Sequence, residues 1–163
     1  MNAMAEQKTN VMRFLEQKKI SYVPHAYPHG DEAVDGPRVA DLIGKAPESV
    51  FKTLVARGAS KTVCVFVIPV SGELDLRRAA TAAREKSVEL VHVSEINALT
   101  GYIRGGCSPL GMKKQYKTFL DNSCEGQESI VVSAGRIGAQ VELAPRDLIK
   151  LTRAFVAPLT KEP

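Results

Sequence analysis

A lysine inside an otherwise apolar segment carries the first group that could do chemistry. In residues 50–56, VFKTLVA, side chains alternate between the faces of a strand, so Lys52 shares a face with Leu54 and Ala56. An ammonium that projects from such a face into a cavity can hold an anion or polarise a carbonyl. The alternative is an edge-strand lysine that discourages strand pairing or extends its amine to water. The residues alone leave both interpretations open.

A glycine-rich stretch could supply main-chain donors. Residues 101–114, GYIRGGCSPLGMKK, contain four glycines, a proline and a serine, a composition that suits neither a helix nor a regular strand. Such a loop can present backbone N–H groups to a phosphate or to a developing oxyanion. It matches neither the phosphate-binding P-loop pattern nor the dinucleotide fingerprint. An irregular surface loop is the alternative.

Basic residues accompany this loop and a second small-residue segment. Lys113 and Lys114 end the first loop, and Arg136 lies within residues 133–138, SAGRIG, which follow a predicted strand. Arginine in such a turn can clamp a phosphate. The alternative for the second segment is a plain hairpin turn. The formal net charge of +4 also suits an anionic partner.

The cysteines and histidines predict neither a metal site nor a cofactor. Three cysteines and three histidines show no CxxC spacing, so free thiols and no zinc site are expected. Cys107 lies inside the glycine-rich loop, but a cysteine nucleophile needs a base within hydrogen-bonding reach. His25 and His29 are distant in the sequence, and His92 ends a predicted strand. A catalytic Cys107 is therefore not favoured.

Length and composition indicate one folded domain, residues 1–163. The 44% apolar and 25% charged fractions are those of a globular protein. The longest apolar run, residues 63–70, is too short to span a bilayer, and the first ten residues lack the apolar core of a secretory signal. A cytoplasmic location is expected.

The pattern of apolar and turn residues predicts an α+β fold. Strands outnumber helices and are joined by short connections, so we expect a mixed, partly closed barrel-like β-sheet flanked by helices. Helices are expected near residues 11–18, 39–43, 72–85 and 94–95 and from Pro145, and strands at residues 20–23 (ended by Pro24), 50–56, 62–70, 88–93, 119–120, 130–133 and 141–143.

Three segments in this order resemble the YbaK/EbsC family of aminoacyl-tRNA deacylases: VFKTL, GYIRGGCSPLGMKK and SAGRIGAQVEL. The similarity runs from about Val11 to Phe155, and the glycine-rich loop is similar to that of the cysteine-specific branch. The resemblance implies a barrel-like mixed sheet and an enzyme of translation fidelity. Its expected activity is trans-editing of misacylated tRNA, above all hydrolysis of Cys-tRNA(Pro). Expected partners are the tRNA acceptor end and prolyl-tRNA synthetase, and neither a membrane nor DNA.

The resemblance also assigns site residues. It implies Lys52 as the key lysine and the amides of Gly105 and Gly106 as backbone donors. The residues that it places at the substrate, or that we expect there from their type, are Tyr27, Thr53, Ser108, Ser133, Gly135, Arg136, Lys113 and Lys114, with Arg104 as a further phosphate contact.

The chain departs from the family pattern at three places. A phenylalanine expected near Asp35 and Gly36 is absent, in a loop one residue shorter than usual. Gln140 stands where some members carry aspartate. Cys107 stands where relatives carry an aliphatic residue, which argues further against it as a nucleophile.

These residues suggest catalysis without a protein nucleophile. An aminoacyl ester is already reactive, so Lys52 and the Gly105 and Gly106 amides could hold the ester and the terminal adenosine. The thiol of the substrate's own cysteine then attacks its carbonyl and releases tRNA and a cyclic thioester, which would make the enzyme formally a lyase. The alternatives are a deacylase for another tRNA such as Ala-tRNA(Pro), and a non-catalytic module that binds aminoacyl-tRNA or a nucleotide.

Overall fold

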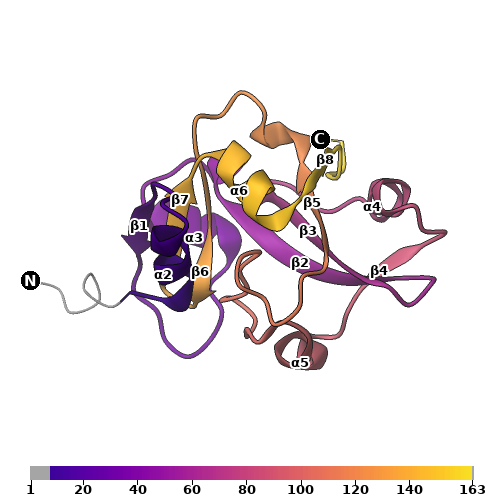
Figure 1. Ribbon diagram of the computed structural model, residues 1–163, viewed down its shortest axis with the longest axis horizontal. Coiled ribbons are helices and arrows are strands. Elements are labelled where there is room, and N and C mark those ends of the chain that lie inside the picture. The colour runs from indigo at the N-terminus through magenta and orange to yellow at the C-terminus, as the bar shows by residue number, and fades with distance from the viewer. Residues whose placement is uncertain (1–7, 163) are drawn as a thin grey trace, which may run out of the picture.

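The computed structural model describes residues 8–162, which form five α-helices and two β-sheets (Figure 1). The helices are α2 (Asn10–Gln17), α3 (Gly36–Leu42), α4 (Leu76–Ala83), α5 (Ile96–Thr100) and α6 (Pro145–Thr152). The strands are β1 (Val23–Ala26), β2 (Phe51–Gly58), β3 (Val63–Pro69), β4 (Val88–Leu90), β5 (Lys117–Asp121), β6 (Ile130–Arg136), β7 (Ala139–Leu143) and β8 (Phe155–Ala157). Short 3-10 helices are η1 (Pro47–Ser49), η2 (Val93–Glu95) and η3 (Asn122–Cys124).

The larger sheet has the strand order β4-β2-β3-β5-β8 and the smaller one β1-β7-β6. Pairing is antiparallel for β2 with β3 and β4 and within the smaller sheet, and parallel for β3 with β5 and β5 with β8. A single parallel bridge between Val50 and Val131 joins the two sheets. The predicted α+β fold with a mixed sheet is confirmed, but it is built from two sheets, and neither of them closes.

The main core lies where the two sheets meet. Phe51 and Val65 of the larger sheet pack in one cluster with Val132 and Val141 of the smaller sheet, and Leu15 of α2 joins them. All are almost completely buried. A second cluster fills the other face of the larger sheet, where α4 packs. Burial of apolar surface therefore holds the two sheets at a fixed angle, and the functional site described below depends on that angle.

Helix ends follow their local chemistry. Asp75 caps α4 by accepting hydrogen bonds from the N–H groups of Arg77 and Arg78, so α4 is shorter than the predicted helix over residues 72–85. Helix α6 begins at Pro145, as predicted, because proline has no N–H to leave unpaired in the first turn. Among residues 8–162, no helix has the length and hydrophobicity that a membrane span requires.

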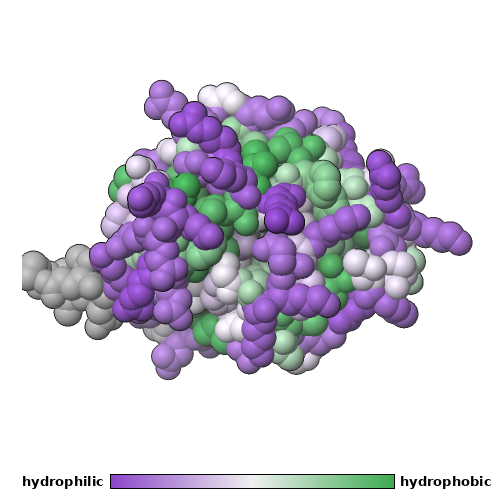
Figure 2. Space-filling view, viewed as in Figure 1, coloured by the Kyte–Doolittle hydropathy of each residue, from purple (hydrophilic) through white to green (hydrophobic). Residues whose placement is uncertain are grey.

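Two predicted strands differ clearly from the structure, and one strand of the structure was not predicted. The strand predicted at residues 20–23 is wrong, because β1 starts at Val23 and includes Pro24. Strand β1 is an edge strand, where a missing N–H costs nothing. The strand predicted at residues 88–93 ends at Leu90, since His92 caps η2. Strand β8 was not predicted. Its residues Phe155 and Val156 are apolar and exposed, and Figure 2 shows apolar surface in the region where Figure 1 places β8.

A cluster of charged and polar side chains connects β7 to β1 and to the segment after α3. The carboxylate of Glu142 lies 2.8 Å from Nε2 of His25 and 3.1 Å from Nζ of Lys45, and it accepts a hydrogen bond from Ser129. Burial alone would raise the pKa of Glu142, but these three partners outweigh it and lower the pKa to about 2. The cluster connects β1, β7 and the segment after α3 as long as Glu142 is ionised.

Candidate functional site

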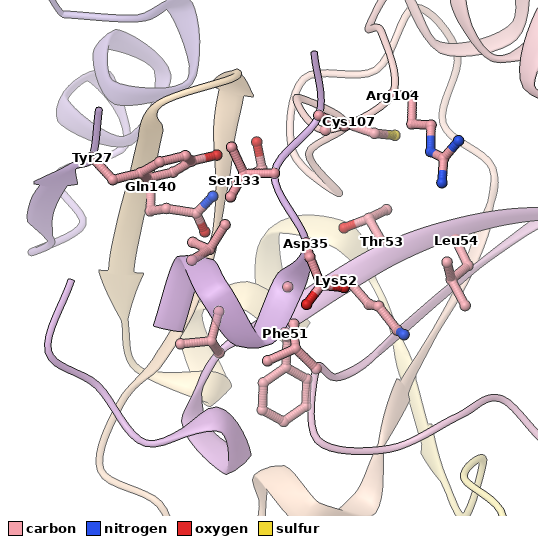
Figure 3. Close-up of a pocket in the computed structure, with 17 residues that line it drawn as sticks. Tyr27, Asp35, Phe51, Lys52, Thr53, Leu54, Arg104, Cys107, Ser133 and Gln140 are labelled. Carbon is pink, nitrogen blue, oxygen red and sulfur yellow. The ribbon is translucent and has the colours of Figure 1, made fainter. Parts of the chain in front are cut away.

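A pocket of about 460 Å³ lies beside the junction of the two sheets (Figure 3). Four parts of the chain form its walls: the first half of β2, the segment from Ala33 to Val39, the loop at residues 104–107, and the facing strands β6 and β7. Its volume is in the range of small-molecule sites in proteins. No histidine is among the seventeen described residues that line it.

The pocket exists because β2 and β6 start side by side and then separate. They form a parallel bridge at Val50 and Val131, and β6 is interrupted by a bulge between Ser133 and Arg136. Gly135 in this bulge has a φ of +101°, which favours glycine. Beyond this one bridge β2 and β6 are not paired, and the pocket lies between residues of the two strands.

Strand β2 presents an open edge to this space. The N–H of Val70 donates to the carbonyl of Val50, and that of Gly58 to Thr62, so even-numbered residues of β2 bond to β3. The peptide groups of odd-numbered residues, including Thr53, therefore face the other edge. Strand β4 covers that edge only from Ala56 onward. The main chain at Thr53 thus lies at the open edge of the sheet, next to the pocket.

Lys52 and Thr53 line the pocket at this edge, and both have unused polar atoms. The half-buried Lys52 amine makes no hydrogen bond or ion pair with any of residues 8–162. The hydroxyl oxygen of Thr53 is buried and has no hydrogen-bond partner in the same part of the chain. Buried polar atoms are nearly always paired, so an orphaned hydroxyl in a pocket wall indicates that a ligand pairs with it.

The opposite wall is polar and rigid. Tyr27 is only 2% exposed, and its N–H donates to the Gly138 carbonyl. The Ser133 hydroxyl accepts a hydrogen bond from the N–H of Gly135 at 3.2 Å, which leaves its own proton free to donate. Gln140, which is 5% exposed, pairs with Ser133 in the β6–β7 register. Figure 3 shows Tyr27, Gln140 and Ser133 together on one side of the pocket.

The two neighbouring glycines of the loop behave differently. Gly105 lines the pocket with a φ of +86°, and a Cβ there would lie 2.7 Å from the Cβ of Ala33. The N–H of Gly106 donates to the Ile103 carbonyl at 2.9 Å, and a Cβ at Gly106 would lie 2.8 Å from the Cα of Arg136. The Gly106 amide, predicted as a backbone donor, is thus used in a turn in this structure, and its role toward a substrate stays a prediction. Gly106 instead allows the loop to approach β6.

Ser108, predicted as a substrate-binding residue, is not among the residues that line the pocket. It is fully buried, and its hydroxyl accepts a hydrogen bond from the N–H of Leu110 at 3.2 Å. Cys107 does line the pocket. Burial raises the pKa of its thiol to about 11, although a hydrogen bond with Thr100 partly opposes the shift. The thiol therefore stays protonated near neutral pH and is a poor nucleophile, as the sequence analysis expected.

The remaining predicted residues lie outside the pocket. Gly135 and Arg136 line a separate hollow of about 270 Å³ together with Arg13 near the start of α2. Lys113 and Lys114 are exposed on the loop and line neither of these two cavities. The structure thus gathers Lys52, Thr53, Tyr27, Ser133 and Gly105 in one site and places the basic residues around it, except Arg104, which lies in the pocket wall. The roles of these residues in binding or catalysis stay predictions.

Sequence reasoning missed Asp35 as a pocket residue and named Gln140 only as a departure. The order Asp-Gly-Pro before an apolar-periodic segment is typical of a helix start, and Asp35 is indeed the residue before α3. Nothing in that local pattern says that the loop folds back over β2. The signal for Gln140 was its position two residues into β7 opposite Ser133, which could be used only once the hairpin register was known.

Among the described residues that line the pocket, no nucleophilic side chain is hydrogen-bonded to a base. A cation, an unpaired hydroxyl and open main-chain groups are suited to a carbonyl or phosphate oxygen. Comparison with known proteins agrees with this chemistry. Residues 32–151 match the aminoacyl-tRNA editing domain family. The chain is 43% identical over 155 residues to the Enterococcus faecalis protein named "Putative Cys-tRNA(Pro)/Cys-tRNA(Cys) deacylase EbsC", covering 95% of this chain and 94% of that one.

Two more distant proteins are similar to this chain, one in sequence and one in structure. A Bacillus subtilis protein, YwhH, is 23% identical over 68% of this chain and 70% of its own length. The solved structure titled "Crystal structure of a putative trans-editing enzyme for prolyl tRNA synthetase" superposes with a TM-score of 0.81 at 23% identity, over 99% of both chains. The match over residues 32–151 and the close relative along nearly the whole length lead to one conclusion: this chain belongs to the aminoacyl-tRNA editing domain family.

Proposed function

We propose that the protein is a trans-acting aminoacyl-tRNA deacylase that removes cysteine from tRNA(Pro). The observation that carries the proposal is that the unpaired Lys52 amine and the orphaned Thr53 hydroxyl line one pocket, in which no described nucleophilic side chain is hydrogen-bonded to a base. The name of the Enterococcus relative, a cysteinyl-tRNA deacylase, supports cysteine as the amino acid. A site that only binds and polarises is sufficient for an ester that carries its own nucleophile.

The reaction needs only the substrate's atoms. The cysteine thiol loses its proton and attacks the ester carbonyl, so that a carbon–sulfur bond forms and the carbon–oxygen bond to the ribose breaks. The proton ends on the ribose hydroxyl, and the products are tRNA and a cyclic thioester, which water then opens to cysteine. The Lys52 amine and the open main-chain groups near Thr53 and Gly105 stabilise the negative charge on the carbonyl oxygen.

The body of the tRNA lies outside the pocket. The exposed Lys113 and Lys114, together with Arg136 and Arg104, contact phosphates of the acceptor end. Phosphate contacts position a nucleic acid without reading its sequence. Selection of tRNA(Pro) then comes from association with prolyl-tRNA synthetase, and the site of action is the cytoplasm. Binding that weakens steeply with added salt supports these contacts, and a flat salt response contradicts them.

Turnover on a panel of substrates tests the proposal. Cys-tRNA(Pro), Ala-tRNA(Pro) and Ser-tRNA(Pro) are incubated with the wild-type protein and with Lys52→Ala. We expect loss of the ester only from Cys-tRNA(Pro) and only with the wild type. Faster loss from Ala-tRNA(Pro) would identify a different deacylase. Protection of the ester on all three tRNAs would identify a binding module and reject the enzyme.

A further inference from the structure

One carboxylate lies in the wall of the Lys52 pocket, and the family pattern does not account for it. Asp35 is the single acidic side chain among the described lining residues, where Lys52 and Arg104 are the two cationic ones. It belongs to the loop in which the chain departs from its relatives. Figure 3 labels Asp35 and Lys52 in the same part of the pocket, while Gln140 lies on the other side with Tyr27.

The Asp35 carboxylate is not used by the fold. Asp35 precedes α3 in the position of a capping residue, but its side chain makes no capping hydrogen bond. It forms no ion pair with any of the residues that the structure describes, including Lys52. An aspartate at a helix start normally accepts a hydrogen bond from the first turn. Asp35 is exposed, so its carboxylate is solvated at the rim of the pocket and remains available to a ligand.

The backbone around Asp35 is held firmly in place. Gly36 packs against the end of β3 so closely that a Cβ there would lie 2.6 Å from Cγ1 of Val70. Pro37 fixes the first turn of α3, and the N–H of Val39 donates to the Asp35 carbonyl at 2.9 Å. The carboxylate thus extends from a fixed point of the pocket rim.

Opposite charges that do not neutralise each other suit a ligand that carries both signs. An aminoacyl-tRNA has a protonated α-amino group close to its ester and phosphates beyond it, since α-amino groups have pKa values near 8. The orphaned hydroxyl of Thr53 independently indicates that this pocket takes a polar ligand. The Asp35 carboxylate can then bind the ammonium group while the Lys52 amine binds a carbonyl or phosphate oxygen of the same molecule.

We propose that Asp35 is a specificity residue that binds the α-ammonium group of the aminoacyl ester. The inference rests on the proposed deacylase function and adds to it the requirement for a free amine. Gln140, which stands where some relatives carry aspartate, offers the pocket no charge, so Asp35 is its one source of negative charge among the described lining residues.

The test pairs a change in the protein with a change in the substrate. Wild type and Asp35→Asn are compared on Cys-tRNA(Pro) and on N-acetyl-Cys-tRNA(Pro), which keeps the thiol and the ester but has no cationic amine. With the free amine we expect Asp35→Asn to lower kcat/KM about 10-fold, the size of one lost charge-assisted hydrogen bond. With the acetylated substrate the two proteins should have equal rates. Asp41→Asn in α3, which lines no part of the pocket, should behave as wild type on both.

Each of the other outcomes would contradict either the role of Asp35 alone or the proposed deacylase function as well. An equal loss on both substrates would mean that Asp35 acts through structure or through another substrate group, and it would overturn the inference. No loss on either substrate would overturn it too. Lack of turnover by the wild type on any cysteinyl-tRNA would reject the proposed function and the inference with it, and is thus distinguishable from failure of the inference alone.

Discussion

Replacement of Lys52 by methionine isolates the charge on which the proposed chemistry depends. Methionine keeps the unbranched stem that packs beside Ile68 across the β2–β3 pair, but it has no ammonium group. A charge about 4 Å from a developing oxyanion contributes about 4 kcal/mol at an effective dielectric constant of about 20. One electrostatic contact typically contributes about 10²- to 10³-fold in rate, and because the amine is only half-buried we expect a loss near the lower end, about 10²-fold.

The assay is single-turnover deacylation of Cys-tRNA(Pro) at saturating protein, so that weaker binding of tRNA does not mask the chemical step. Lys86→Met is the matched control, because Lys86 is an exposed lysine between α4 and β4 that lines no part of the pocket. Lys86→Met lowers the net charge of the protein by one unit, as Lys52→Met does. Rates of Lys52→Met within a few-fold of those of the control would refute the role of the amine.

Three further predictions concern neighbouring groups. Thr53→Val removes an orphaned hydroxyl with little change of shape, so the melting temperature should stay equal or rise while kcat/KM falls about 3- to 10-fold; a lower melting temperature would show that the hydroxyl stabilises the fold. Cys107→Ala should deacylate at the wild-type rate, because the Cys107 thiol, with a pKa of about 11, is protonated near neutral pH. A folded but inactive Cys107→Ala variant would instead indicate that Cys107 is a nucleophile. Glu142 titrates at about 2 instead of 4.5, so its stabilising contribution is complete above pH 4.5 and is lost as pH falls toward 2. In urea unfolding, the advantage of wild type over Glu142→Gln should therefore shrink over that interval, and a constant difference would contradict the cluster.

Local patterns in the sequence were sufficient to predict most of the strands and helices. The apolar and turn residues predicted strands at residues 50–56 and 62–70, which match β2 and β3, and Pro145 predicted the start of α6. The same alternation singled out Lys52 but left open whether its amine enters a cavity or extends to water, and the structure places Lys52 in the pocket lining. These features depend on neighbours within a few residues along the chain.

Features that depend on distant segments could not be predicted. The short strand β8 exists because β5 offers it a parallel edge, and its sequence, FVA, is too short to indicate a strand. The Gly106 amide is consumed by a turn whose geometry no composition rule gives. Asp35 enters the pocket only because its loop crosses over to the end of β3, where Gly36 permits close contact with Val70.

The pocket, too, depends on segments that are distant from one another in the sequence. The pocket lies between two sheets that share one bridge, so its walls come from segments more than a hundred residues apart. The wall of Tyr27, Ser133 and Gln140 belongs to the smaller sheet, or to the segment that follows its first strand, and Lys52 belongs to the larger one. A core that both sheets share fixes the distance between these walls, so mutations that loosen it should weaken activity before they unfold the protein.

The most direct measurement of the central claim compares Cys-tRNA(Pro) with S-methylcysteinyl-tRNA(Pro) on the wild-type protein. The two substrates share the amine, the ester and the tRNA, and differ only in whether the sulfur can attack the carbonyl. If Lys52 and the open edge of β2 only hold and polarise the ester, the methylated substrate should decay at the rate without protein. Deacylation of both substrates at similar rates would show that the protein supplies or activates its own nucleophile, in contradiction to this account.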